Sequence, residues 1–179
     1  MTAIAPQIRI EDADRPSYKK SLPLLLAAIL AIVVGLGSAV GGAFGAWFTW
    51  DQAVAQEVVT PDDAAIPGEP VRGPFTMWAQ ADIITHHQLD NTDGLYYSQM
   101  ERMVPELDDN GDVVVDENGE AVMVPNEARN SWITATTLTT ALSLGVLSYA
   151  LAALAFVTGL TLVTVGLVFL HIRRKAILL

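Results

Sequence analysis

Two long stretches of this 179-residue chain contain no Asp, Glu, Lys, Arg or His, and they limit its possible folds more than any other feature. They cover residues 22–50 and 131–170. A run of about 18 or more apolar residues without charge is typical of a transmembrane helix, because a helix satisfies its own backbone hydrogen bonds in lipid. The sequence therefore predicts a membrane α protein whose two helices form a hairpin around residues 51–130.

The distribution of charge predicts the orientation of this hairpin. Residues 51–130 contain 17 Asp and Glu against three Arg, a net charge of −14 (3 minus 17). The other basic residues flank the apolar stretches: Arg9, Arg15, Lys19, Lys20, Arg173, Arg174 and Lys175. Cytoplasmic flanks collect Lys and Arg. We therefore expect a multi-pass plasma-membrane protein with cytoplasmic tails at residues 1–21 and 171–179, the second one basic, and an acidic extracytoplasmic segment at 51–130.

The two apolar stretches differ in length. Residues 22–50 fit one span and are about twice as long as a signal-peptide core, so we expect a retained helix although Ala53-Val54-Ala55 has the form of a cleavage site. Residues 131–170 would make a helix of about 60 Å, against a hydrocarbon core of about 30 Å. We therefore expect this helix to begin near Asn126, where Pro125-Asn126 is a start signal, to project outside first, and to cross the membrane from about residue 145.

The residue types that are missing exclude several functions. Cysteine is absent, which excludes disulfides, thiolate metal sites and covalent haem attachment. Neither apolar stretch holds Asp, Glu, Lys, Arg or His, so the helices cannot relay protons through side chains or ligate haem through histidine within the membrane. No basic patch suits nucleic acid. We expect a non-enzymatic chain without catalytic residues or cofactors.

Small residues on the first helix predict close helix packing. Gly37, Gly41 and Gly45 recur every four residues, and small side chains on one face let another helix approach closely. The second helix of the same chain is the first candidate for this neighbour. A different membrane protein and a second copy of the chain remain alternatives.

The segment between the helices divides into three parts. Residues 51–72 are rich in Pro, Gly and acidic side chains and are expected to form an extended linker. Gly73-Pro74 can begin a surface helix that ends near Leu89. Two Asn-Gly turns, in which both residues are expected to have positive φ, then separate three β-prone pieces. These pieces predict a three-stranded antiparallel meander: residues 103–107, 112–116 and 120–124. The expected fold of this segment is thus α+β.

Exposed aromatic side chains indicate where this segment contacts a partner. Leaving Phe75 and Trp78 in water would be unfavourable, so both should be buried against something. We expect the partner contacts to be Phe75, Trp78, Ile84 and Tyr96, together with the meander. The partners would be larger integral membrane proteins and the lipid bilayer.

Two adjacent histidines offer an alternative function. Asp82 and His86 lie four residues apart on the expected helix, but His87 lies about 100° round from His86, so the histidines do not share a face. A two-histidine metal site on one helix requires a spacing of four. We therefore assign no metal ligand, and an extracytoplasmic metal-binding protein or enzyme that uses His86 and His87 is the alternative.

A resemblance adds to these inferences. The residues that carry it are Val71-Arg72-Gly73-Pro74-Phe75, Ala79-Gln80-Ala81, Ile84, His87, Leu89, Thr92, Gly94-Leu95-Tyr96 and Arg129, followed by an apolar helix. This pattern resembles a family of small actinobacterial two-helix membrane proteins often labelled "aromatic ring-opening dioxygenase". The Asn-Gly region departs from the shorter members of that family as an insertion.

The dioxygenase label finds no support in the residues. Iron-dependent ring cleavage requires two histidines and a carboxylate in a facial arrangement, whereas the segment offers only the adjacent His86 and His87. The resemblance also implies an accessory subunit of the actinobacterial cytochrome bc–cytochrome oxidase supercomplex. We therefore expect a non-catalytic structural subunit that stabilises or assembles a membrane complex. The respiratory supercomplex is the first candidate for that complex.

Overall fold

A computed structural model describes residues 22–175. Residues 1–21 and 176–179 lie outside the described residues, and with them the predicted N-terminal tail, part of the C-terminal tail and four of the flanking basic residues. The elements are α1 (Leu22–Val54), α2 (Pro74–Asp90), a short 3-10 helix η2 (Tyr97–Gln99), β1 (Met103–Pro105), β2 (Met123–Pro125) and α3 (Glu127–Lys175).

The two predicted long helices are confirmed as helices. α1 and α3 contain 33 and 49 residues, and both are long and apolar enough to cross a membrane. α1 continues beyond its predicted end to Val54, whereas α3 begins at Glu127, next to the predicted start at Asn126. Asn126 explains this start, because its side-chain Oδ1 accepts a hydrogen bond from the Arg129 N–H at 3.1 Å and so caps the helix.

The chain divides into two compact units. Unit 1 consists of residues up to Gly41 and from Ala155 onward, and unit 2 runs from Gly42 to Leu154. Unit 1 therefore holds the first part of α1 and the last part of α3. Unit 2 holds the remainder of both helices, all of α2 and the small sheet.

In unit 1, α1 and α3 pack antiparallel through small residues. Gly159 lies against Gly35 and Ala39. Gly166 lies against Ala28 and against Ile32, which is one helical turn farther along α1. The approach is so close that an added β-carbon at Gly35 would lie 2.7 Å from the Gly159 carbonyl oxygen. The backbones therefore touch at this seam, as small-residue packing allows.

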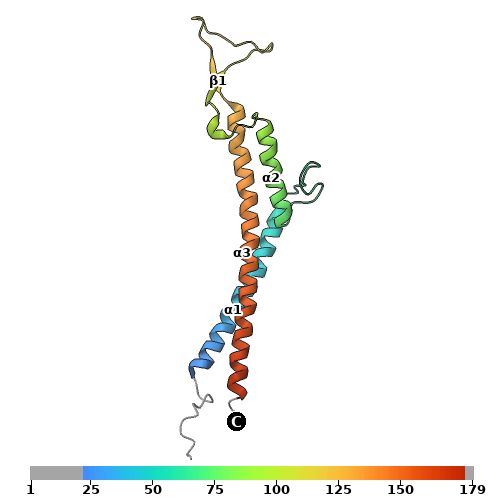
Figure 1. The fold of residues 1–179 in the computed structure, drawn as a ribbon, viewed down its shortest axis with the longest axis vertical. Coiled ribbons are helices and arrows are strands. Elements are labelled where there is room, and N and C mark those ends of the chain that lie inside the picture. The colour runs from blue at the N-terminus through green and yellow to red at the C-terminus, as the bar shows by residue number, and fades with distance from the viewer. Residues whose placement is uncertain (1–21, 176–179) are drawn as a thin grey trace, which may run out of the picture. The chain divides into compact units, whose positions relative to one another are not determined.

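In unit 2, α2 packs antiparallel against the first half of α3 (Figure 1). Near the start of α2, the buried Met77 lies over Gly145. Near its end, the Gln88 side-chain amide donates a hydrogen bond of 2.6 Å to Ser131 Oγ. The buried Trp132 indole donates to the Leu95 carbonyl at 3.0 Å, which fixes the chain that follows α2. The predicted surface helix is thus confirmed, and it lies on α3.

Residues 58–71 form a closed loop, and the predicted extended linker is wrong. The Val71 N–H donates to the Val58 carbonyl at 2.8 Å, so the two ends of the loop meet. Thr60 fills the interior and is only 2 % exposed. Its hydroxyl accepts from the Glu69 N–H at 3.0 Å and donates to the Ile66 carbonyl at 2.5 Å. These bonds replace the water contacts that an open linker would make.

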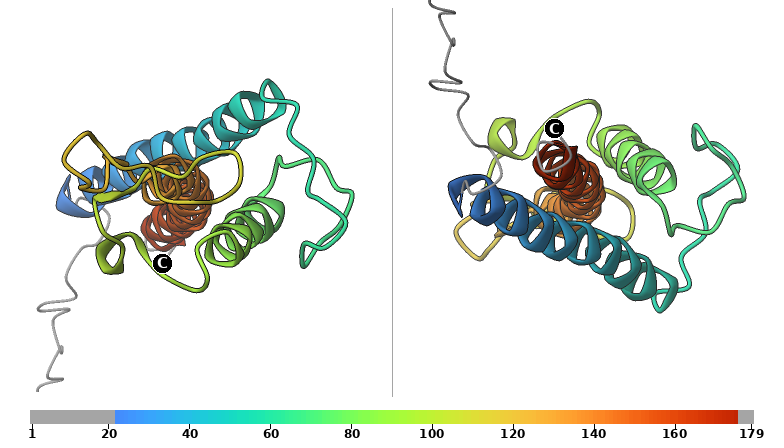
Figure 2. Two further views of the ribbon diagram at one scale, coloured as in Figure 1. Left: turned by 90° about the horizontal axis from the view of Figure 1, so that it is seen from above. Right: turned by 90° about the horizontal axis from the view of Figure 1, so that it is seen from below.

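The three β-prone pieces do not form the predicted meander. β1 pairs directly with β2 in antiparallel register, with Val104 opposite Val124. The residues between them fold into two arms, each held by one bridge: Leu107 opposite Val113, and Val115 opposite Ala121. Figures 1 and 2 show the two arms diverging beyond β1.

A ring of three hydrogen bonds joins β1, β2 and the two arms. The Glu106 N–H donates to the Val122 carbonyl at 2.8 Å. The Val122 N–H donates to the Val114 carbonyl at 2.9 Å, and the Val114 N–H donates to the Glu106 carbonyl at 2.8 Å. The middle piece pairs at Val113 with the first piece and at Val115 with the third, so its two ends pair in different directions. The outer pieces are thereby free to pair with each other.

Both Asn-Gly turns are present, but with a different backbone conformation from that expected. Gly111 and Gly119 have positive φ of 86° and 79°, whereas among the described non-glycine residues only Glu57 and Asp93 do. The asparagines therefore keep negative φ, as in a three-residue turn that ends in a left-handed glycine. In the first turn, Asp108 Oδ1 accepts from the N–H groups of Asn110 and Asp112, both at 2.9 Å.

Candidate interaction surfaces

Two of the three glycines of the predicted face, Gly37 and Gly41, do not pack within the described chain. A β-carbon added at Gly37 or Gly41 would meet nothing within 4 Å, and one at Gly45 would meet only the Ala152 β-carbon at 3.8 Å. The interpretation that the second helix covers Gly37 and Gly41 is therefore wrong. These two glycines form an unpartnered stripe on α1 within the described residues, which leaves the intermolecular alternatives open.

A different small-residue pattern makes the helix contact. Buried small residues recur every seven positions on both long helices: Ala28, Gly35 and Gly42 on α1, and Ala152, Gly159 and Gly166 on α3. A seven-residue repeat keeps one face of each helix toward its neighbour. This spacing was available in the sequence, but the four-residue glycine repeat is more conspicuous.

The start of α2 presents two large aromatic side chains to the exterior. Phe75 is 77 % exposed and Trp78 is 55 % exposed. The sequence forms the helix here because Pro74 suits a first turn and Thr76 Oγ1 accepts a hydrogen bond from the Gly73 N–H at 3.2 Å. Residues 22–175 thus leave most of the Phe75 side chain and more than half of the Trp78 side chain uncovered.

The other two predicted contact residues lie in different surroundings. Tyr96 is exposed on one side and stacks on Trp132 with ring centroids 5.3 Å apart. Next to it, the Arg129 guanidinium lies 3.7 Å from the centroid of the Tyr97 ring. Ile84 is only partly exposed and faces inward, into a groove. The four predicted residues therefore do not form one continuous patch.

This groove lies within unit 2 between α1, α2 and α3 and has a volume of about 580 Å³. Its walls are largely apolar and include Phe48, Met77, Ile84 and Leu142. Gln80 also lines it, and the Gln80 Oε1 atom is buried without a hydrogen-bond partner. The sequence did not indicate the groove, because its walls come from three helices that are far apart along the chain.

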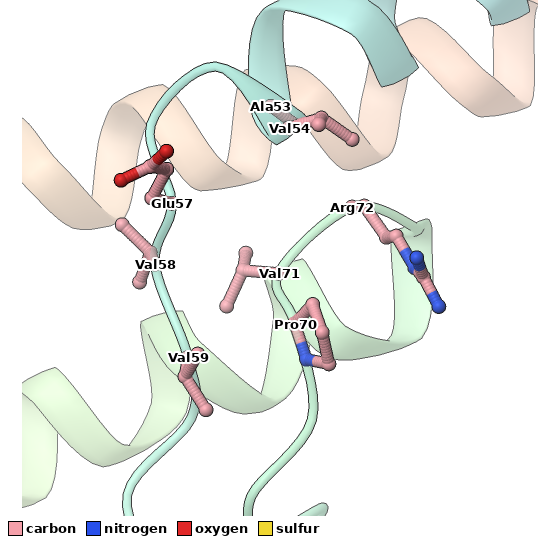
Figure 3. Close-up of a pocket in the computed structure, with 8 residues that line it drawn as sticks. All are labelled: Ala53, Val54, Glu57, Val58, Val59, Pro70, Val71 and Arg72. Atoms are coloured by element: carbon pink, nitrogen blue, oxygen red, sulfur yellow. The ribbon is translucent and has the colours of Figure 1, made fainter.

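A smaller hollow of about 210 Å³ lies where the closed loop meets the end of α1 (Figure 3). Figure 3 shows Val71 directed toward Val58 and the Arg72 side chain directed away. The lining is mostly aliphatic, with Glu57 at one side. Without a cluster of polar groups that converge on it, this hollow offers no chemistry.

The two histidines point to different partners. His87 Nε2 lies 2.7 Å from Asp63 Oδ2 of the closed loop. His86 Nδ1 lies 3.0 Å from the Asp82 backbone carbonyl and 3.6 Å from its carboxylate. Within residues 22–175, no three His, Asp or Glu side chains come close enough together to hold a metal ion. The structure therefore does not bring Asp82, His86 and His87 into one site.

We expect the substitution His87→Ala to raise the pKa of Asp63. The hydrogen bond from His87 holds the pKa of this carboxyl below its ordinary value of 3.8. Because the folded-state pKa is lowered, the pair stabilises the loop above pH 3.8, and this contribution is lost as the pH falls through the folded-state pKa. An NMR titration of the Asp63 carboxyl measures the change. His86→Ala is the control, and an unchanged Asp63 pKa in His87→Ala would contradict the assignment.

Comparison of this chain with protein-family models, with curated proteins and with solved structures gives no match. The fold itself defines a small protein with two long apolar helices that could cross a membrane and a two-stranded sheet. Its candidate interaction sites are the unpartnered glycine stripe of α1, the exposed aromatic side chains of α2 and the apolar groove of unit 2.

Proposed function

We propose that α1 and α3 cross the plasma membrane as a hairpin, with cytoplasmic termini and residues 51–130 outside. Both helices are long and apolar enough for this. From Tyr149 to Leu170, α3 would cover about 33 Å, close to the hydrocarbon core of about 30 Å. Basic residues follow this stretch at Arg173 and Arg174, as expected on the cytoplasmic side.

We infer that the protein is a non-catalytic subunit of a larger membrane complex. The outer half of α3 carries this inference. Residues 131–148 precede the proposed span and contain no charged side chain. Nevertheless Ile133 is 57 % exposed, and Leu138 and Leu144 are exposed as well. A helix in water normally presents charged residues on its outer face, so another protein is the better neighbour for this surface.

The aromatic side chains of α2 support the proposed position of the outer segment at the membrane. The Tyr149 hydroxyl donates to the Arg72 carbonyl at 2.7 Å, which places the start of α2 at the level of Tyr149. Aromatic rings at this level suit a membrane interface, and Trp78 lies about one turn farther along α2. Burial of Phe75 or Trp78 would contribute about 1.5–3 kcal/mol each.

The proposed role is to stabilise or assemble the complex. Neither proposed span contains Asp, Glu, Lys, Arg or His, which is unlike the spans of proton-relaying or haem-ligating subunits. The resemblance to small actinobacterial two-helix proteins makes the cytochrome bc–cytochrome oxidase supercomplex the first partner to test.

Purification of the tagged full-length chain from its own membranes in mild detergent tests the proposal. We expect larger integral membrane proteins at fixed stoichiometry, identified by mass spectrometry. Cytochrome bands in the visible spectrum would identify the respiratory complex as the partner. A colourless preparation that contains other membrane proteins would contradict the respiratory assignment, and a preparation without partners would contradict the subunit role.

The unpartnered stripe gives a more specific test. Gly41→Ile adds bulk where a neighbouring helix would approach, so we expect at least tenfold weaker retention of the complex, about 1.4 kcal/mol. The unfolding of the chain alone should not change, because a β-carbon at Gly41 meets nothing within 4 Å. Val40→Leu is the control, since Val40 is exposed on a different face of α1. Full retention of the complex by Gly41→Ile would contradict docking through this stripe.

A further inference from the structure

The β region presents one continuous apolar face. Side chains alternate between the two faces of a strand, and directly paired residues share a face. The pairs Pro105–Met123, Leu107–Val113 and Val115–Ala121 therefore place odd-numbered residues together. We call this set the apolar plate: Met103, Pro105, Leu107, Val113, Val115, Ala121, Met123 and Pro125.

Every residue of the apolar plate has an uncharged, apolar side chain, and the described chain covers none of them. Leu107 is 60 % exposed and Val115 is 57 % exposed, and all eight residues fall in the exposed class. The ring residues Glu106, Val114 and Val122 point to the opposite face, because each lies between two plate residues along the chain. An apolar face of this extent on a small protruding element indicates an interaction site.

The surroundings of the apolar plate are strongly acidic. Residues 103–125 contain seven Asp and Glu and no Lys or Arg. Six of the seven lie in the two turns at the tips of the arms: Asp108, Asp109, Asp112, Asp116, Glu117 and Glu120. Hydrogen bonds from backbone N–H groups hold the pKa of Asp108 and Asp116 below the ordinary value of 3.8, so both carry charge at neutral pH.

We infer that the apolar plate docks onto a folded protein domain whose own apolar patch is bordered by Lys and Arg. This inference rests on the proposed function and names the partner surface. Apolar contact would supply the burial, and the acidic tips would pair with the basic border and orient the encounter. The binding would therefore weaken as salt concentration rises.

The charge around the apolar plate argues against three other binding partners: a second copy of the chain, an anionic lipid surface and nucleic acid. A second copy of the chain would bring acidic tips against acidic tips, which is repulsive. An anionic lipid surface would repel the same tips, and so would the phosphates of nucleic acid. A basic protein surface is the occupant for which both the apolar face and its border are favourable.

Site-specific cross-linking in the intact complex tests this inference. Because the chain lacks cysteine, Leu107→Cys or Val115→Cys can carry a single photo-cross-linker, with Glu106→Cys on the opposite face as the matched control. We expect cross-links from both plate positions to one companion protein, next to Lys or Arg residues, and few from the control. Cross-links only to a second copy or to lipid, or none above the control, would overturn the inference.

Charge reversal at the tips is the second measurement. Asp109→Lys with Glu117→Lys changes two equivalent turn positions and leaves the hydrogen-bonding carboxylates of Asp108 and Asp116 intact. We expect at least tenfold weaker retention of the cross-linked companion, and Asp62→Lys in the closed loop serves as the control. Unchanged retention would overturn the role of the acidic tips.

The two proposals fail in distinguishable ways. A complex that co-purifies normally but gives no cross-links from the plate contradicts only the docking inference. The absence of any companion protein contradicts the subunit role itself.

Discussion

Gly159→Leu is expected to force α1 and α3 apart in unit 1 and to destabilise the protein by about 3 kcal/mol. A β-carbon at Gly159 would lie 2.5 Å from the Gly35 carbonyl oxygen and also within contact of Ala39 backbone atoms. Backbone cannot rotate away as a flexible side chain can, so the helices must separate. Gly37→Leu is the matched control, because a β-carbon at Gly37 meets nothing within 4 Å.

Two measurements check this expectation. Unfolding in a titration with denaturing detergent should begin earlier for Gly159→Leu than for the parent or for Gly37→Leu. The disulfide between Gly45→Cys and Ala152→Cys gives a direct readout of helix separation, because the β-carbons at these positions lie 3.8 Å apart, a distance typical of disulfides. Its yield should fall in the Gly159→Leu background. Equal stability and equal disulfide yield in both variants would contradict close packing of Gly159 against Gly35 and Ala39.

The double substitution Phe75→Ser with Trp78→Ser is expected to weaken association with the membrane complex by at least about 30-fold, or about 2 kcal/mol. Large aromatic side chains contribute most to binding when a partner covers them fully. Both are mainly exposed in the isolated chain, at 77 % and 55 %. The stability of the chain alone should therefore change little.

The amount of complex retained after affinity purification, as a function of wash stringency, measures this effect. Asp90→Ser, at the other end of α2, is the control because it is exposed and changes no aromatic surface. If the double variant keeps the complex as well as the parent does, these aromatic rings belong to the membrane interface and not to a protein contact.

The sequence was a good guide to the elements whose formation depends on local chemistry. The absence of charge in residues 22–50 and 131–170 predicted two long helices, and Gly73-Pro74 predicted where α2 begins. Asn-Gly predicted both turns, although it predicted the wrong backbone conformation at the asparagines. In each case a few neighbouring residues determine the outcome, through backbone φ, capping or the solvation of the peptide group.

The sequence was a poor guide to pairings between distant residues. β1 and β2 pair with each other across the two arms, and no local property of their residues distinguishes this from a meander. The closed loop depends on Val58 meeting Val71 and on the burial of Thr60. Likewise, the inward position of Ile84 follows from where the three helices of unit 2 meet.

The candidate surfaces show the same division. Phe75 and Trp78 were identified from the sequence because large aromatic rings on a short helix need cover, and they are exposed as that argument requires of a contact with another molecule. The apolar plate was not identified, because its residues share a face only through the register of three pairs.

The sequence alone determined that this protein has two long apolar helices, an acidic segment between them, and no cysteine, because these properties depend only on which residues are present and in what order. Only the tertiary structure decided which small residues carry the helix contact. Both glycine patterns are equally small, but the face that α1 turns toward α3 places Gly35 and Gly159 in the seam and leaves Gly37 and Gly41 facing outward. The choice of that face results from packing over many residues of both helices, and no single stretch of sequence contains it.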